Sequence, residues 1–366
     1  MISIAKPWIT QSEIDAVTQV MDSGMIACGK TVTNFEENFA AYIGAKYGIA
    51  TTSGTTALEV ALRAMGIGAG DKVITTAYSF IASTNCIVYV GATPVFVDID
   101  PDDFNMDMAA LEQTLQANPD AKVLLLVHLF GQACNMDEVM RLAKAYGVKV
   151  LEDCAQAHGA MWNGQKVGSF GDAAAFSFYP TKNMTTGEGG IVLTNSDALA
   201  EKARLLINHG MKIRYTHEEI GYNYRMTNMA AAIGLEQLKR LDGFNEARRT
   251  NAQYLDTHIT NPLVQTPVVR GKAHPVYHQY TVRVKGGKRD ALIKLLEENQ
   301  IGYGIFYPFS IPEQPCYEKF HFEKQWKNTD EVKQEVLSLP IHPALTQGDM
   351  ETIARVINTL DVTADV

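Results

Sequence analysis

The amino-acid sequence predicts an α/β fold, in which a large, doubly wound and mainly parallel sheet of seven strands precedes a small C-terminal α+β domain. Between about residues 48 and 195, short apolar runs rich in β-branched residues alternate with helical patterns. Most of these runs are apolar on both faces, which is typical of strands that helices cover on two sides. The 366 residues are enough for two domains, which we place at 1–249 and 250–366.

The elements of the large domain follow from caps and spacing. A helix is expected over residues 10–23, because Thr10 and Glu13 form a capping box and apolar residues repeat behind them at helical spacing. The expected strands are 48–51, 73–76, 94–99, 123–130, 149–152, 173–178 and 190–194. Helical patterns between them include 55–65, 81–90 and 136–146. This alternation is typical of a parallel sheet with crossover helices.

The C-terminal third has a different pattern. A long helix is expected over residues 227–249, with Thr227 as its cap, and it closes the large domain. A stretch with proline and glycine follows over residues 261–274. After it come an expected strand at 278–284 and helices at 289–299 and 346–360, which we assign to the small domain.

Composition and charge exclude several classes of protein. The net charge of −9, from 32 basic and 41 acidic residues, argues against a nucleic acid or an anionic membrane as the main partner. The longest apolar run, 123–127, is far shorter than the roughly 20 residues that span a bilayer, and no signal peptide is visible. The five cysteines are scattered without a CxxC pair, so we expect neither disulfides nor a metal site. We therefore expect a cytoplasmic protein.

One segment between a strand and a helix has the features of an anion site. The chain has no G-x-G-x-x-G after a strand, no Walker A sequence and no G-x-S-x-G elbow. Gly54 instead allows close approach of the backbone, and N–H groups at the start of the helix would face an anion. The hydroxyls of Thr55 and Thr56 add donors. The alternative interpretation is that Ser53 or Thr55 only caps the helix.

Two later segments carry groups that suit cofactor chemistry. Asp153 directly follows the strand at 149–152, and ligands of doubly wound folds bind at the carboxyl ends of strands. Its alternative roles are a helix cap and a surface acid. Lys182 lies in a loop behind Pro180, which stops the strand at residue 178. A loop lysine is usually solvated, but a lysine held near a cofactor can form a Schiff base.

These features converge on pyridoxal 5′-phosphate (PLP). This cofactor needs a phosphate cradle, an acid that pairs with the protonated pyridine nitrogen, and a lysine that carries the aldehyde. The cradle lies at residues 53–58, and Lys182 follows Asp153 by 29 residues.

Eight segments, in order, resemble a known family. They are SGTTAL, AYSFIAS, PVFVDID, EDCAQAHGA, FSFYPTKN, GEGG, NHG and GYNYRMT. Over roughly residues 1–345 the chain resembles the DegT/StrS family of PLP-dependent sugar-nucleotide aminotransferases, which have the fold-type I (aspartate aminotransferase-like) architecture. The resemblance implies that Lys182 is the Schiff-base lysine and that it also moves the proton. It implies that Asp153 pairs with the pyridine nitrogen.

The resemblance also implies the other cofactor contacts. Gln156 matches the partner of the ring's 3-oxygen, and Phe80 falls where the family stacks an aromatic ring on the pyridine. Gly54, Thr55 and Ser177 match the phosphate cradle. Asn223 matches a phosphate contact that the family donates from the neighbouring subunit, so a homodimer with active sites at the subunit interface is implied.

The implied reaction is a ping-pong transamination, in which an amino acid, by family habit glutamate, provides the amino group for a keto-sugar linked to a nucleotide. The aminosugars made by such enzymes enter lipopolysaccharide and other polysaccharides. Weaker substrate-binding candidates, each with a packed aromatic or histidine as the alternative, are His158, His209, Tyr215, Tyr307 and His342. Two other functions stay open: a PLP enzyme of the same fold that acts on a keto-cyclitol or as a dehydrating variant, and a PLP-binding regulatory protein.

Overall fold

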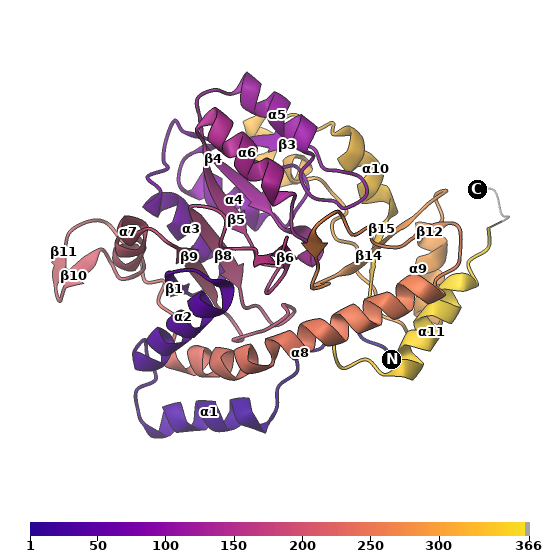
Figure 1. Cartoon of the computed structure of the whole chain (residues 1–366), viewed down its shortest axis with the longest axis horizontal. Helices are drawn as coiled ribbons and strands as arrows, with labels where there is room; N and C mark the ends of the chain where they lie inside the picture. The colour runs from indigo at the N-terminus through magenta and orange to yellow at the C-terminus, as the bar shows by residue number, and fades with distance from the viewer. Residues whose placement is uncertain (363–366) are drawn as a thin grey trace.

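A computed structural model describes residues 1–362, and its centre is a seven-stranded sheet (Figure 1). The strands are β1 (Tyr47–Thr51), β2 (Lys72–Thr76), β3 (Thr93–Val97), β4 (Ala121–Val127), β5 (Lys149–Asp153), β8 (Ala173–Ser177) and β9 (Gly190–Thr194), in the order β1-β9-β8-β5-β4-β2-β3. β9 is antiparallel to both of its neighbours, and the other six strands run in one direction. The prediction of a mainly parallel seven-stranded sheet is therefore confirmed.

Helices cover both faces of this sheet. Those on one face are α2 (Lys30–Ile43), α5 (Met108–Ala117), α6 (Met136–Tyr146) and α8 (Asn228–His258), and those on the other are α3 (Gly54–Ala64), α4 (Ala82–Tyr89) and α7 (Asp197–Ile207). In β4, Leu124 and Leu126 pack into the first layer, whereas Val123 and Leu125 pack into the second. Because strand side chains alternate between faces, an unbroken apolar strand needs both layers. The predicted doubly wound architecture is confirmed.

A smaller unit forms around a second sheet. Its strands are β12 (Val264–Gln265), β14 (Tyr280–Val284) and β15 (Val336–Leu339), which pair antiparallel, and its helices are α9 (Arg289–Glu298), α10 (Lys327–Glu335) and α11 (Gln347–Asn358). It has a hydrophobic cluster of its own, which includes Leu255, Val282 and Ile353. The other elements are α1 (Gln11–Asp22), β6 (Met161–Trp162), β7 (Gln165–Lys166), β10 (Met211–Ile213), β11 (Thr216–His217), β13 (Ala273–His274), η1 (Leu129–Gly131), η2 (Ile311–Glu313) and η3 (Pro315–Phe320).

Two findings bear on the predicted domain division. Helix α8 has 31 residues and passes from beneath the large sheet to the small unit, so it does not end at residue 249 (Figure 1). The N-terminus also reaches the small unit, where the Ile2 N–H donates to the Gln300 carbonyl at 2.9 Å. The division into 1–249 and 250–366 remains a proposal, and the separate hydrophobic cluster supports it.

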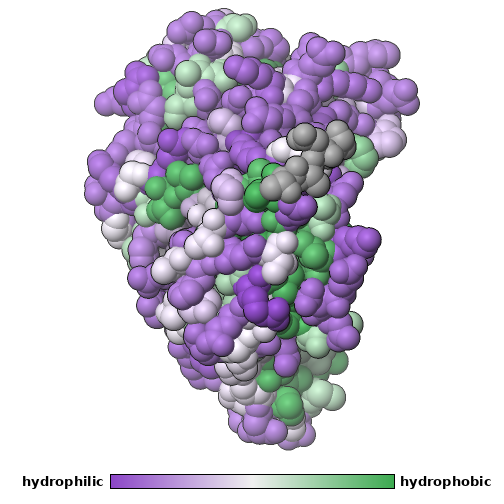
Figure 2. Space-filling view, turned by 90° about the vertical axis from the view of Figure 1, so that its right-hand side faces the viewer, coloured by the Kyte–Doolittle hydropathy of each residue, from purple (hydrophilic) through white to green (hydrophobic). Residues whose placement is uncertain are grey.

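The surface is mixed rather than broadly apolar on the face that bears the small unit. Figure 2 shows hydrophilic residues over most of this face, with smaller hydrophobic patches between them. Among residues 1–362, none of the helices combines the length and the apolar character that crossing a bilayer requires.

Candidate active site

A cavity of about 410 Å³ lies at the carboxyl ends of β5 and β8. It is lined by eight of the site residues predicted from the sequence: Gly54, Thr55, Phe80, Asp153, Gln156, Ser177, Lys182 and Tyr307. These residues come from five separate segments of the chain, at 54–55, 80, 153–156, 177–182 and 307. The fold brings them together because the carboxyl ends of parallel strands meet at one edge of a sheet.

One wall of the cavity is the start of helix α3. The Ser53 hydroxyl accepts from the Thr56 N–H at 3.2 Å, and the Thr56 hydroxyl donates back to the Ser53 carbonyl at 2.9 Å. Thr56 therefore serves the helix cap and does not line the cavity. Helix geometry leaves the N–H groups of Gly54 and Thr55 without an intrahelical acceptor. A Cβ on Gly54 would lie 2.6 Å from the Ser177 Cβ, so a glycine is required where α3 meets β8.

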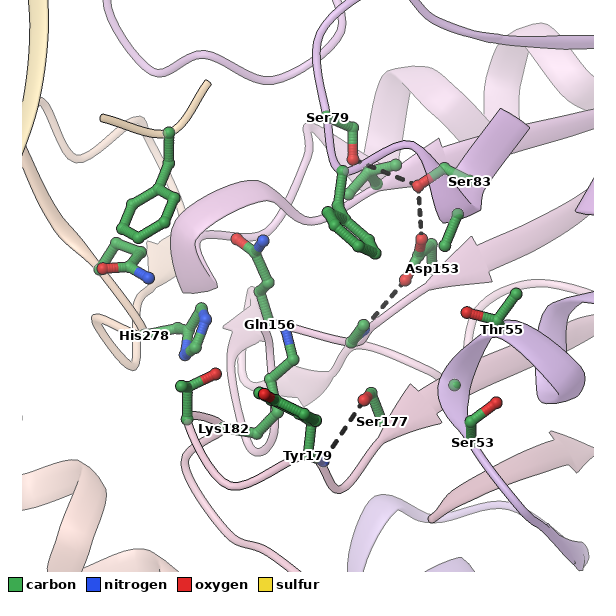
Figure 3. Close-up of a pocket in the computed structure, with 18 of the residues that line it drawn as sticks. Ser53, Thr55, Ser79, Ser83, Asp153, Gln156, Ser177, Tyr179, Lys182 and His278 are labelled. Carbon is green, nitrogen blue, oxygen red and sulfur yellow. Dashed lines mark hydrogen bonds between the residues drawn. The ribbon is translucent and has the colours of Figure 1, made fainter. Parts of the chain in front are cut away.

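Asp153 forms the floor of the cavity at the end of β5 and is only 3% exposed. Its Oδ2 accepts from the Ser83 hydroxyl at 2.8 Å and its Oδ1 from the Ala155 N–H at 3.0 Å. Ser79 contacts Ser83 at 3.2 Å, so a short hydroxyl chain ends on the carboxylate (Figure 3). Burial raises the pKa of Asp153, while the Ser83 hydrogen bond and the charge of Lys182 oppose that rise.

Lys182 projects into the cavity from the loop behind β8 (Figure 3). Within the described chain its Nζ has no hydrogen-bond or salt-bridge partner. Burial lowers the pKa of Lys182 to about 8, and the nearby Asp153 carboxylate limits the decrease. The loop is held in place by Asn183, whose side chain donates to Asn245 Oδ1 at 2.8 Å and to the Val276 carbonyl at 3.0 Å. An amine on an anchored loop, with a lowered pKa and no partner within residues 1–362, is a good nucleophile.

The opposite wall brings in the C-terminal part of the chain. Gln156 accepts from the Phe130 N–H at 2.7 Å and donates to the Tyr307 hydroxyl at 3.1 Å. Phe80 is 54% exposed, and its ring centroid lies 6.2 Å from that of Tyr307. Its exposed face is free to stack on a planar ligand.

The remaining predicted site residues lie outside this cavity. His158 is buried against Phe39 and Phe176, and its Nε2 lies 2.8 Å from the Ser177 carbonyl oxygen. Burial lowers the pKa of His158 to about 3, so it is a packed histidine that supports the end of β8. His342 is also buried, and its Nε2 lies 3.1 Å from the Ser3 carbonyl oxygen.

Three others are exposed, at or near the β10–β11 hairpin on the left edge of Figure 1. Tyr215 lies between the two strands and is 78% exposed. His209 precedes β10, and Asn223 lies in the segment that returns from β11. A site formed within one chain would leave these residues unused.

Sequence reasoning missed several cavity residues. They are Ser79, Ser83, Tyr179, Arg248, His278 and Gln279. Ser79 and Ser83 both lie in the AYSFIAS segment, so the motif indicated this region but not the hydrogen bond from Ser83 to Asp153. Nothing local indicates that Arg248, in a long helix, reaches a cavity.

A second cluster of buried groups lies beneath the site. Ligand atoms of His128, Glu152 and Cys154 lie within 4.8 Å of one another. The Glu152 carboxylate accepts from the N–H groups of Gly168, Phe170 and Gly171, each at 2.8 Å, and lies 3.0 Å from His128 Nε2. These bonds use the carboxylate to tie the 168–171 turn to the sheet, which is a structural role.

The cavity residues fit PLP. The N–H groups of Gly54 and Thr55 have no acceptor within the helix, and Gly54 lies directly against Ser177, a combination that suits a phosphate. Asp153 is held as an acceptor for a cationic ring nitrogen, and Lys182 offers an amine that has no partner in the described part of the chain.

Comparisons with known proteins agree with this geometry. The family model described as the DegT/DnrJ/EryC1/StrS aminotransferase family matches residues 7–360. GDP-perosamine synthase of Caulobacter vibrioides is 41% identical over 98% of this chain and 97% of its own, and a pleiotropic regulatory protein of Geobacillus stearothermophilus is 40% identical over 93% and 91%. The crystal structure of S. venezuelae DesV in complex with a ketimine intermediate superimposes with a TM-score of 0.91 and 36% identity, covering 95% of this chain and 94% of that one.

These matches confirm the predicted fold, the transaminase class and the PLP cofactor, because enzymes of this family depend on PLP. The chain belongs to the DegT/DnrJ/EryC1/StrS aminotransferase family.

Proposed function

We propose that this aminotransferase moves an amino group from an amino acid, glutamate, to the keto group of a sugar linked to a nucleotide. The observation that carries the proposal is the unpaired amine of Lys182, which shares a cavity with the anchored carboxylate of Asp153 and the start of α3. The relative named GDP-perosamine synthase supports a nucleotide-linked sugar as substrate.

Each cavity residue has a role in this proposal. PLP, when bound, supplies the electron sink for the reaction. Lys182 Nζ would hold the cofactor aldehyde, and its free amine would carry a proton at the substrate carbon. Asp153 keeps the ring nitrogen protonated. The N–H groups of Gly54 and Thr55, together with Ser177, hold the phosphate.

Three side chains complete the pocket. Gln156 would contact the 3-oxygen of the ring, and the exposed Phe80 would stack on the ring. Tyr307 faces the substrate from the C-terminal part of the chain. His158 and His342 are not retained as substrate contacts, because both are packed against the protein's own groups.

We also propose a homodimer in the cytoplasm. Asn223 is exposed and lies outside the cavity of its own chain, as expected of a residue that completes the site of a partner. His209 and Tyr215 accompany it around the β10–β11 hairpin and are proposed to face the substrate of the neighbouring subunit. The product would enter polysaccharide biosynthesis, including lipopolysaccharide.

The direct test is incubation of the holoenzyme with glutamate and a panel of nucleotide keto-sugars, with products read by mass spectrometry. A gain of one amino group on a panel member supports the proposal. If glutamate converts bound PLP to its amine form but no nucleotide sugar reacts, the substrate is of another class, such as a keto-cyclitol. If no amino acid converts the cofactor, the chain is a PLP-binding regulatory protein and the proposal is wrong.

A further inference from the structure

Two side chains that the proposed reaction leaves unused share one wall of the cavity. Arg248, on α8, is 6% exposed, and His278, just before β14, is 5% exposed. Arg248 Nη1 donates to the carbonyl oxygens of Tyr277 at 3.0 Å and His278 at 3.4 Å, which fixes the two residues against each other.

Both side chains retain unused hydrogen-bonding groups. Arg248 Nε and His278 Nδ1 are buried and have no partner among residues 1–362, and no carboxylate in this range forms a salt bridge with Arg248. Burying a cation without a counterion destabilises the folded protein. A buried arginine that lacks an acidic partner is therefore typical of a site for an anionic ligand. Burial and the positive charges of Lys182 and Arg248 hold the pKa of His278 well below its usual value, which also indicates a positive local field.

This wall is not the phosphate cradle. Figure 3 shows His278 on the side of the cavity away from Ser53 and Thr55, with Lys182 between the two sides. The anion that fits here therefore lies beside the reactive amine, at the other end of the site from the phosphate.

Two anionic substrates could bind this wall, the amino-acid donor and the nucleotide-linked sugar, and the position of the wall next to Lys182 favours the donor. In an α-amino acid, the carboxylate is only two bonds from the amino nitrogen that must reach the position of the Lys182 amine. In a nucleotide-linked sugar, the sugar ring separates the charged diphosphate from the keto carbon. We propose that Arg248 and His278 form the subsite for the α-carboxylate of the amino donor, an inference that rests on the proposed function.

The test uses holoenzyme and a probe that binds without turnover. α-Methyl-L-glutamate keeps the amine and both carboxylates but has no α-proton, so the absorbance of the bound cofactor reports its dissociation constant. A hydrogen bond to a charged group typically contributes about 1.5–3 kcal/mol, so Arg248→Gln should raise this constant at least about tenfold. His278→Asn should raise the dissociation constant as well, and within residues 1–362 the His278 side chain has no hydrogen bond that this change would remove.

A neighbouring arginine gives a matched control. Arg249 lies next to Arg248 on α8 but pairs with Glu246 at 2.9 Å, and Arg249→Gln should leave the dissociation constant unchanged. L-Isoglutamine, the α-amide of glutamate, should bind the unmodified enzyme at least about tenfold more weakly than glutamate. That preference should shrink in Arg248→Gln.

The outcomes separate this inference from the proposed function. If no amino acid changes the cofactor absorbance of the unmodified enzyme, both are wrong. If glutamate reacts but both variants keep the unmodified dissociation constant, or glutamate and isoglutamine bind equally, only the carboxylate subsite is wrong. If Arg248→Gln fails to fold, two measurements still test the subsite: the dissociation constant of His278→Asn, and the preference of the unmodified enzyme for glutamate over isoglutamine.

Discussion

Gly54→Ala tests whether α3 and β8 must touch to hold the cofactor phosphate. The ideal Cβ at this position would lie 2.6 Å from the Ser177 Cβ and 3.2 Å from its Cα and Oγ. Carbon atoms in contact prefer a separation of about 3.5–4.0 Å, so the methyl group needs about 1 Å of extra room. The start of a packed helix and the end of a central strand can yield this room only by moving apart.

The expected cost has two parts. Overpacking of this kind destabilises a protein by about 1–3 kcal/mol. The same displacement turns the Ser177 hydroxyl and the first N–H groups of α3 away from their common target. Loss of one hydrogen bond to a charged phosphate, at about 1.5–3 kcal/mol, weakens PLP binding by roughly 10- to 150-fold.

PLP affinity and thermal unfolding of the cofactor-free protein measure these two parts separately. Gly243→Ala is the matched control, because Gly243 lies exposed in α8 with nothing within 4 Å of its ideal Cβ. Because alanine has a higher helix propensity than glycine, Gly243→Ala should leave the free energy of unfolding equal or increase it by up to about 1 kcal/mol, with PLP affinity unchanged. Unaltered PLP affinity in Gly54→Ala would refute the assignment of this contact as the phosphate cradle.

Three further predictions concern the reacting groups. The rate at which PLP attaches to cofactor-free protein, measured by trapping with hydride, should rise about tenfold per pH unit up to pH 8 and then level off. The reason is that rising pH deprotonates Lys182, whose pKa is about 8. A rate that continues to rise to pH 10 contradicts this. Asp153→Asn should keep the hydride-trappable attachment but slow the conversion of bound PLP to its amine form by glutamate at least about tenfold, and Ser83→Ala should slow it less. Stopped-flow absorbance measures these rates, and equal rates in both variants and the unmodified enzyme contradict the role of the carboxylate. At a PLP concentration too low to load Asn223→Ala, mixing this variant with Lys182→Ala should restore about a quarter of the activity through hybrid dimers. No recovery after subunit exchange argues against a shared site.

The sequence was sufficient for the large sheet because its strands are buried on both faces. A run such as residues 123–127 has no polar position, and only a strand between two helical layers can bury all of it. Helix α2 was missed although Val32, Phe35 and Phe39 show the helical repeat. Strand β15 was missed for a different reason, because four residues with one serine are too short to show a period.

The site was predictable where one segment supplies both the group and its setting. The cap at Ser53 and the free N–H groups of α3 lie within a few residues of each other, so the anion site was visible locally. The Ser83 bond to Asp153 joins residues 70 positions apart, and Arg248 reaches the cavity through the packing of α8. Such contacts depend on topology, which no local pattern encodes. Both interpretations of His158 stayed open in the sequence for the same reason, since only the packed fold shows the aromatic rings around it.

The separation of Asp153 from Lys182 explains why this site can react. Two opposite charges buried in one cavity would normally pair, and a direct salt bridge would keep the lysine protonated and unreactive. Within the described chain no such bridge forms, because Ser83 and the Ala155 N–H hold the carboxylate at the floor of the cavity. The pyridine nitrogen and the aldehyde carbon stand at opposite ends of the PLP ring. A carboxylate and an amine kept apart can therefore serve those two ends at once, and Ser83 maintains the separation before the cofactor arrives.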